Sequence, residues 1–308
     1  MKNKIIIDEN KKYLKGNLHV HTNASDGKYS VEEVCQKYGS MGYDFLAITD
    51  HNVVYKGSNF VNGMLVVPGV EVACTYNGEI DYKKGSYSHF NLIGILNSEY
   101  DVIYPSLYNN VDEINLQIKK FQDKGILVQY NHPNFSRFSD NEYFNLNCFD
   151  MIEIYNHKDY TMETCLESAD AIIRNYLFRG KMFMISCGDD YHGNHDNDLD
   201  FYCRKSFVMV NADLNIESVV NALAQGDFYV SNGPLINDLR IIDNVIYLKT
   251  EKVRRVFFYN FTRRSKHLYN FNGFTECSYE IKGDERYIFI KIEDMDGNNA
   301  WVQPIYVN

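Results

Sequence analysis

Short apolar runs that end beside histidines and carboxylates are the feature that most limits how this chain can fold. The run Leu18–His21 closes on a His-Val-His triplet, and the run Phe45–Thr49 is followed by Asp50 and His51. Such runs are typical of buried strands, and segments with amphipathic-helix spacing lie between them through the first two-thirds of the chain. This alternation predicts a mainly parallel α/β fold. The predicted strands are residues 18–21, 45–49, 64–70, 90–96, 126–131, 151–155, 183–187 and 207–210, and the predicted helices follow Ser30 and cover about 111–123, 162–179 and 216–225.

A capping box predicts where the first helix begins. Ser30 is followed three residues later by Glu33, so each side chain can bond the backbone N–H of the other. Val34, Cys35 and Tyr38 then fall on one helical face. We therefore expect a helix that starts after Ser30 and packs this face on the sheet.

The sequence pattern changes after Gly233-Pro234. Apolar residues alternate with polar ones from Leu239 onward, and turn signals such as Asp296-Gly297-Asn298 separate the segments. No helical period is present there. The sequence thus predicts two domains, a larger α/β unit at 1–235 and a small antiparallel β domain at 236–308.

Charge and cysteine content limit the partners and the compartment. Lys and Arg total 31 against 41 Asp and Glu, a net charge of −10, which argues against non-specific nucleic-acid binding. The seven cysteines are scattered and form no CxxC pair, so we expect reduced thiols in the cytoplasm. The first residues contain only a short apolar run, Ile5–Ile7, which is no signal peptide, and no segment is long enough to span a membrane.

Histidines and carboxylates cluster where the predicted strands end. His19 and His21 are two residues apart on a strand, so both imidazoles point to the same side. Loops at the carboxyl ends of strands converge on one face in α/β folds, and ligands bind there. Imidazole together with carboxylate suits Zn, Mn or Fe, and suits Mg or Ca poorly. We therefore expect two or three divalent metal ions at this face.

Each motif has a structural alternative when it is taken alone. A single HxH on a strand is common, Asp26-Gly27 is a turn signal, and Pro68-Gly69 could merely shape a loop. The metal interpretation depends on their combination at successive strand ends. The candidate ligands are His19, His21, Asp26, His51, Glu71, His89, His132, Asp190 and His192.

The order of these motifs resembles a known family. HVH, SDG, TDH, PGVE, H, NHP and DDYH occur here in the order seen in the polymerase-and-histidinol-phosphatase (PHP) superfamily of metal-dependent phosphoesterases. The resemblance covers about residues 16–235. GNLHVHTNASDGKYSVEEV and GYDFLAITDHN look especially like the branch that includes carbaryl-hydrolase-type metallohydrolases. The resemblance implies a distorted (β/α)7 barrel that holds up to three metals, followed by a small C-terminal antiparallel β domain.

The resemblance also implies how the ligands are divided. Asp190, rather than Asp189, matches the family pattern because it lies two residues before His192. Asp189 is expected to orient a ligand histidine instead. The spacing between Glu71 and His89 varies in such proteins. The implied groups are His19, His21 and Asp190 for the first metal, Glu71 (bridging to the first metal), His89 and His132 for the second, and Asp26, His51 and His192 for the third.

The sequence thus predicts a multinuclear metal-dependent hydrolase, most simply a phosphoesterase that acts on small, perhaps nucleotide-like phosphate esters through a metal-bridging hydroxide. No catalytic residue beyond the metal cluster is identified. Arg137, five residues past His132, is the best candidate for binding phosphate, and Asn156 could contact substrate at a strand end. Lys28 and Lys158 are weaker candidates, because a solvated charge is the favoured interpretation of both lysines.

Two alternatives stay open. The branch resemblance also fits a carboxyl-ester or carbamate hydrolase on the same metal core, which would need an apolar pocket and fewer cations. A non-catalytic binding module is disfavoured because the ligand set is intact. A role as the exonuclease of a polymerase is disfavoured by the net charge of −10.

Overall fold

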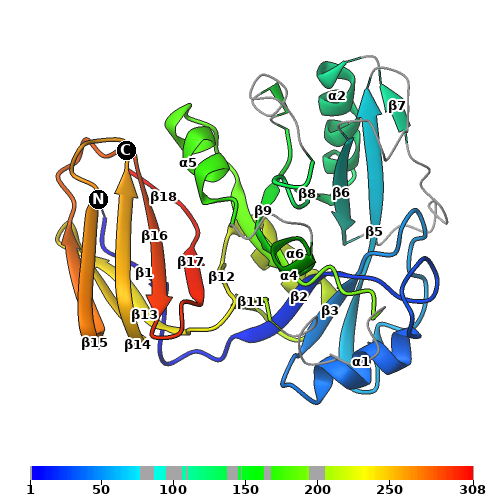
Figure 1. Ribbon diagram of the computed structural model, residues 1–308, viewed down its shortest axis with the longest axis horizontal. Helices are drawn as coiled ribbons and strands as arrows, with labels where there is room; N and C mark the ends of the chain where they lie inside the picture. The colour runs from blue at the N-terminus through cyan, green and yellow to red at the C-terminus, as the bar shows by residue number, and fades with distance from the viewer. Residues whose placement is uncertain are drawn as a thin grey trace.

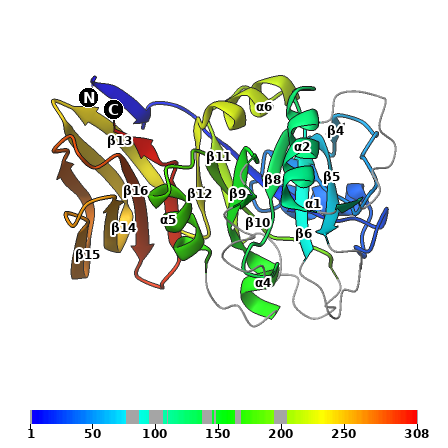
Figure 2. The ribbon, with the colours of Figure 1, turned by 90° about the horizontal axis from the view of Figure 1, so that it is seen from above.

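The computed structural model describes residues 2–76, 87–94, 106–108, 110–136, 145–146, 148–162, 168–193 and 205–307. Over these ranges the fold is mixed α/β, with one large sheet and several short helices. Figures 1 and 2 show two parts side by side, with the antiparallel strands β13 to β18 at one end of the molecule. None of the described helices combines the length and the apolar content that a membrane crossing needs.

Seven strands form a continuous row that carries the candidate site. Neighbours in the row are hydrogen-bonded in the order β2, β3, β5, β6, β8, β9 and β10. An isolated parallel bridge joins Val20, at the end of β2, to Tyr191, just past β10, and so brings the two ends of the row together. The strands are β2 (Leu14–Val20), β3 (Phe45–Ile48), β5 (Met64–Tyr76), β6 (Tyr87–Ile93), β8 (Leu127–Tyr130), β9 (Met151–Asn156) and β10 (Met184–Gly188).

Within the seven-strand row, β6 departs from the parallel arrangement that the sequence predicts, and outside the row β11 (Phe207–Val210) runs antiparallel to β2. β6 runs antiparallel to both of its neighbours, with Val72 of β5 opposite Phe90 and Tyr130 of β8 opposite the same residue. Only residues 77–86 separate β5 from β6, whereas a parallel crossover needs about a dozen residues or more and usually a helix. The short connection therefore favours an antiparallel neighbour.

The helices begin where their caps predict. Ser30 and Glu33 form the expected capping box at the start of α1 (Val31–Gly39), and Val34, Cys35 and Tyr38 are buried. α6 (Ile216–Gln225) ends at Gly226, whose φ of 75° is left-handed. The helix predicted over 162–179 is shorter, because α5 begins at Asp170, and a separate short helix, α4, ends at Met162. The other helices are α2 (Val111–Gln122), α4 (His157–Met162) and α5 (Asp170–Phe178).

The C-terminal strands form an antiparallel sheet around their own apolar core, as the alternation predicts. Its edge also includes β1 (Lys4–Ile7), which pairs with β13 and which the sequence reading did not assign to a strand. The remaining strands are β4 (Phe60–Val61), β7 (Ser106–Tyr108), β11 (Phe207–Val210), β12 (Phe228–Ser231), β13 (Ile236–Ile242), β14 (Val245–Asn260), β15 (Lys266–Glu280), β16 (Tyr287–Asp294), β17 (Asn299–Val302) and β18 (Ile305–Tyr306).

Several contacts tie this sheet to the seven-strand row. Gln303 accepts a hydrogen bond from the Ile185 N–H (2.7 Å) and donates one to the Ile185 carbonyl (2.9 Å). The Trp301 indole and the Lys291 ammonium both contact the Asp170 carboxylate of α5, at 3.1 and 3.0 Å. The predicted domain boundary at 235/236 stays a prediction.

Candidate metal centre

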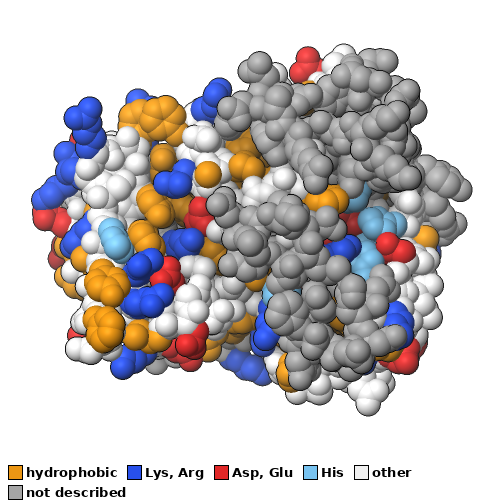
Figure 3. Space-filling model, viewed as in Figure 1, with side chains coloured by type: hydrophobic (Ala, Val, Ile, Leu, Met, Phe, Trp, Pro, Cys, Tyr) orange, Lys and Arg blue, Asp and Glu red, His pale blue; other side chains and the backbone are white. Residues whose placement is uncertain are grey.

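The row of strands gathers all nine candidate ligands into one site. His19 and His21, at the end of β2, are both fully buried. Glu71 lies inside β5 rather than after it, because that strand continues to Tyr76. In the space-filling view, histidine, acidic and basic side chains are exposed together on the right-hand part of this face (Figure 3).

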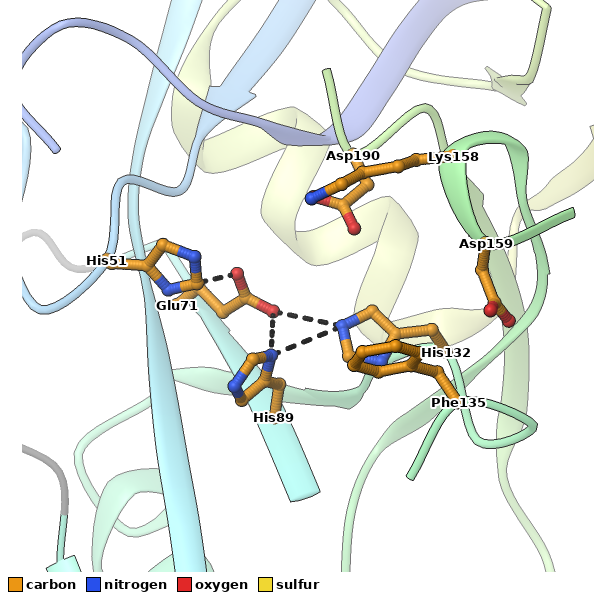
Figure 4. Close-up of a pocket in the computed structure, with 8 residues that line it drawn as sticks. All are labelled: His51, Glu71, His89, His132, Phe135, Lys158, Asp159 and Asp190. Atoms are coloured by element: carbon orange, nitrogen blue, oxygen red, sulfur yellow. Dashed lines mark hydrogen bonds and ion pairs between the residues drawn. The ribbon is translucent and has the colours of Figure 1, made fainter. Parts of the chain in front are cut away.

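Glu71 lies at the centre of the cluster, and five imidazoles surround its carboxylate. The pocket view shows it between His51, His89 and His132 (Figure 4). The side-chain amide of Asn131 donates a hydrogen bond to Glu71 Oε1 at 2.8 Å and so helps to fix the carboxylate. Glu71 Oε1 lies 3.3 Å from His19 Nε2, 3.1 Å from His89 Nδ1 and 3.3 Å from His132 Nε2. Glu71 Oε2 lies 3.2 Å from His21 Nε2 and 3.3 Å from His51 Nδ1.

Asp190 faces Glu71 across the two β2 histidines. Its Oδ1 lies 3.2 Å from His21 Nε2 and 3.5 Å from His19 Nε2. The residue has a φ of 52°, a left-handed conformation that non-glycine residues adopt at some cost. Its N–H donates to the His19 carbonyl at 2.9 Å, which fixes this strained position beside β2. The backbone thus presents Asp190, not Asp189, to the cluster.

Asp26 is the third carboxylate of the cluster and is more exposed to solvent than Glu71 and Asp190. Its carboxylate is 56% exposed and lies 3.3 Å from His192 Nε2 and 3.8 Å from both His21 Nδ1 and His51 Nε2. Gly27 permits the turn, because a Cβ there would lie 2.8 Å from the backbone of His21 and Thr22. His21 therefore faces Glu71 with one nitrogen and Asp26 with the other.

The donor atoms fit divalent metal ions. Among the described residues, three sets of side chains each place one donor atom from every member within 4.8 Å of the others. The buried atoms His19 Nε2, both His21 ring nitrogens and Asp190 Oδ1 have no hydrogen-bond partner within the described ranges. Buried polar atoms are normally satisfied, so this arrangement matches a set of ligands. The sets are His21, Asp26, His51 and His192; His19, His21, Glu71 and Asp190; and Glu71, His89 and His132.

The charges of the cluster shift its pKa values in opposite directions. Burial would raise the pKa of Glu71, but His19, His89 and His51 outweigh it and hold that pKa well below its usual range. Burial lowers the pKa of His21, but Asp190 and Glu71 raise it to about 9. At His51, burial dominates and lowers the pKa to about 4. Carboxylates that stay ionised beside imidazoles are suited to binding cations.

Two buried carboxylates outside the predicted ligand set shape the site. Glu153 of β9 accepts a hydrogen bond from His19 Nδ1 at 3.2 Å, the orienting role that the sequence reading gave to Asp189. Asp189 instead accepts from the Tyr38 hydroxyl at 2.8 Å and from the Ser206 N–H at 2.9 Å. The orienting role expected for Asp189 stays a prediction. A lone glutamate within the apolar run Met-Ile-Glu-Ile-Tyr was the available sequence signal for Glu153, because a buried charge needs a partner.

A cavity of about 50 Å³ opens on the cluster. Lys158 lies beside it, with Nζ 3.8 Å from Asp190 Oδ1 and 3.3 Å from His192 Nδ1, so this lysine belongs to the site more directly than its sequence context indicated. Lys28 is exposed, with its ammonium 5.4 Å from the ring centre of Tyr29. The cavity is lined by His51, Glu71, His89, His132, Phe135, Lys158, Asp159 and Asp190 (Figure 4).

The sequence predicts two substrate-binding residues, Arg137 and Asn156, and the structure describes only Asn156. Arg137 lies outside the described residues, as does His195. Asn156 is buried at the end of β9, where its amide donates to Glu153 Oε2 at 3.0 Å and to Asp190 Oδ2 at 3.4 Å. These bonds give Asn156 a role in holding Asp190. His267 stacks on Phe257 in the C-terminal sheet and is not part of the cluster.

One curated protein matches a short part of the chain. A stretch of 46 residues is 41% identical to DNA polymerase/3'-5' exonuclease PolX of Bacillus subtilis (strain 168), but it covers 15% of this chain and 8% of that protein. The chain thus spans less than a tenth of the length of this curated relative.

Two solved structures are similar at low identity. One is a two-domain protein from Bacteroides vulgatus that contains a predicted PHP-like metal-dependent phosphoesterase, at 14% identity, with a TM-score of 0.46 and coverage of 96% of both chains. The other is a protein from Bifidobacterium adolescentis described as a metal-dependent phosphoesterase, at 12% identity, with a TM-score of 0.40 and coverage of 59% of this chain and 89% of that one.

A family model supplies the assignment. The model of the PHP domain matches residues 17–178, more than half of the chain, and the match includes the β2 histidines, Glu71 and His132. The chain therefore belongs to the PHP domain family.

Proposed function

We propose that this protein is a multinuclear metal-dependent phosphoesterase that acts on small phosphate esters. The observation that carries the proposal is the sharing of ligands: Glu71 belongs to two of the three donor sets, and His21 also belongs to two. Shared ligands bring adjacent ions close together, and closely spaced ions are the usual apparatus for cleaving phosphate esters. The three sets support two or three ions.

The donor chemistry favours Zn, Mn or Fe. The nine side chains comprise six imidazoles and three carboxylates, and imidazole nitrogen suits these metals better than Mg or Ca. When bound, the ions would supply Lewis acidity to the oxygens of the substrate and lower the pKa of a water molecule.

The chain's own residues bind and orient the substrate in this proposal. The Lys158 ammonium lines the cavity beside Asp190 and can neutralise an anionic substrate oxygen. Phe135 packs edge-on against His132, with ring centres 5.4 Å apart, and gives the cavity one apolar wall. Asn156 holds Asp190 in place from behind.

The finer architecture belongs to the same proposal. The seven-strand row and the Val20–Tyr191 bridge support a distorted (β/α)7 barrel. The separate core of β13 to β18 supports a small C-terminal β domain after residue 235. The described cysteines are free thiols, which supports a cytoplasmic location.

A hydrolysis assay tests the function. Protein loaded separately with Mn, Zn and Fe is given a phosphomonoester, a phosphodiester, a set of nucleotides, an aryl ester and an aryl N-methylcarbamate. We expect phosphate release that a chelator abolishes. Turnover of only the neutral ester or the carbamate would contradict the proposal and favour the carboxyl-ester or carbamate hydrolase.

A further inference from the structure

Glu153 lies at the meeting point of two ligand sets. It is 1% exposed, in the middle of β9, and each of its oxygens faces a different candidate ligand. Oε1 lies 3.2 Å from His19 Nδ1, and Oε2 accepts the His132 N–H at 2.8 Å. Oε2 also accepts from the Asn156 amide at 3.0 Å. The Glu153 carboxylate thus contacts one member of each of two donor sets. His19 belongs to the set with His21, Glu71 and Asp190, and His132 belongs to the set with Glu71 and His89.

The bond to His19 determines which ring nitrogen is available. A carboxylate only accepts hydrogen bonds, so His19 Nδ1 carries a hydrogen and donates it to Glu153. In the neutral ring the lone pair is then on Nε2, the nitrogen that faces Glu71 and Asp190 at 3.3 and 3.5 Å. This is the arrangement in which a metal-binding histidine is normally held.

The bond to His132 stabilises a strained backbone. His132 has a φ of 25°, which few non-glycine residues adopt, and its Nε2 lies 3.3 Å from Glu71 Oε1. The Glu153 carboxylate accepts the N–H of this strained residue, and a charged acceptor gives a stronger hydrogen bond than a neutral one.

We infer that Glu153 is a positioning residue that sets the tautomer of His19 and the backbone of His132, so that two ligand sets depend on it. This inference rests on the proposed metal-binding role of the site. It assigns Glu153 no contact with substrate.

The effect of Glu153→Gln follows from donor matching. All three groups around the side chain donate: an imidazole N–H, a backbone N–H and an amide. A glutamine carbonyl can serve only one side, and its NH2 must face the other. If the NH2 faces His19, the imidazole must accept at Nδ1 and carry its hydrogen on Nε2. The nitrogen that faces Glu71 then has no lone pair with which to bind a metal ion. If it faces His132, two donors oppose each other at a strained residue.

Gly188 offers a second, steric route to the same carboxylate. A Cβ at Gly188 would lie 2.3 Å from His19 Cβ and 2.7 Å from Glu153 Oε1. Gly188→Ala therefore pushes the carboxylate and His19 apart while both side chains keep their chemistry. Glu285→Gln is the matched control, because Glu285 is another fully buried glutamate but accepts from Lys282, Gly283 and Tyr279 in the C-terminal sheet.

The test uses the full chain and Zn²⁺ as the probe. Affinity is measured by competition with a chromogenic chelator, stoichiometry by elemental analysis, and the His19 nitrogens by ¹⁵N NMR of the Zn-loaded protein. We expect Glu153→Gln and Gly188→Ala to bind Zn²⁺ about 10- to 100-fold more weakly than wild type, with altered His19 ¹⁵N shifts, while Glu285→Gln binds as wild type does.

The outcomes separate the inference from the proposed function. Wild-type affinity and unchanged His19 shifts in both site variants would overturn the role of Glu153 and leave the metal site intact. A wild-type chain that binds no Zn²⁺, Mn²⁺ or Fe²⁺ would contradict the proposed function and the inference together. If Glu153→Gln does not fold, the Zn²⁺ affinity of Gly188→Ala decides.

Discussion

Asp50 holds the turn at Thr22 through two hydrogen bonds, accepting the Thr22 N–H at 2.7 Å and the Thr22 hydroxyl at 2.6 Å. A third bond from the Ser25 hydroxyl, at 2.7 Å, ties the next residues of the turn to the same carboxylate. Asp26 follows directly and is the most exposed of the candidate ligands. The position of Asp26 therefore depends on a buried carboxylate that is not itself in any of the three donor sets.

Asp50→Asn should weaken the set that contains Asp26 and spare the other two. An asparagine amide donates as well as accepts, so it cannot accept from both Thr22 groups and Ser25. We expect the affinity for one equivalent of metal to fall about 10- to 100-fold. Elemental analysis after dialysis against a range of free Zn²⁺ measures this. Thr22→Ser, which keeps the hydroxyl, is the control, and uniform weakening of every equivalent would argue against this assignment.

Glu71→Ala should remove metal from two sets and abolish turnover. Its two oxygens face five imidazoles, so no other side chain replaces it. Elemental analysis and the hydrolysis assay are the measurements. Retained stoichiometry together with normal activity would disprove the bridging role of Glu71.

Lys158→Met should impair anionic substrates selectively. Loss of one hydrogen bond to a charged group costs about 1.5–3 kcal/mol, so KM for a phosphomonoester should rise about 10- to 100-fold, while kinetics on a neutral aryl ester change little. Steady-state kinetics on both substrates give the result. Lys119→Met is the control, because Lys119 is 63% exposed and pairs with Asp123 away from the site. Equal effects on both substrates would remove Lys158 from phosphate recognition.

Glu285→Gln should reduce stability in a pH-dependent way without affecting the site. Burial would raise the pKa of Glu285, but the N–H groups of Lys282 and Gly283 outweigh it and hold the pKa below its usual 4.5. A lowered pKa means that the carboxylate stabilises the fold above about pH 4.5 and that this contribution is lost as the pH falls through the folded-state pKa.

The expected loss is about 1–3 kcal/mol in the free energy of unfolding at pH 7, shrinking towards zero in acid. Urea unfolding of wild type and variant at pH 7 and at pH values below 4.5 measures the difference. A difference that stays constant over this range would show that the charge of Glu285 does not stabilise the fold.

The sequence was most informative where one local rule governs the structure. The capping box at Ser30 and Glu33 predicts the start of α1, and period-two alternation predicts the antiparallel strands near the C-terminus. Convergence of strand ends predicts that His19 and Asp190, far apart in the chain, come together, and the structure places them 3.5 Å apart. Their role as ligands stays a prediction.

Other features depend on partners that no local pattern shows. The direction of β6 follows from the short connection before it, and the pairing of β1 with β13 joins residues more than 230 positions apart. Glu153 and Asp50 act through hydrogen bonds to residues far away in the sequence, so only the assembled fold shows what each one holds. Substrate contacts are the least predictable part, because the Asn156 amide donates to Glu153 and Asp190, and no sequence pattern shows these partners.

The bonds between Gln303 and Ile185 bear on how the chain matures on the ribosome. Ile185 is fully buried in β10, and its N–H and carbonyl are satisfied by a side chain 118 residues later. At a synthesis rate of about 5–20 residues per second, β10 waits roughly ten seconds for that partner. During this interval the N–H and carbonyl of Ile185 lack the partner that they have in the folded chain. The backbone of β10 is therefore fully satisfied at Ile185 only after the segment between β17 and β18 has been synthesised.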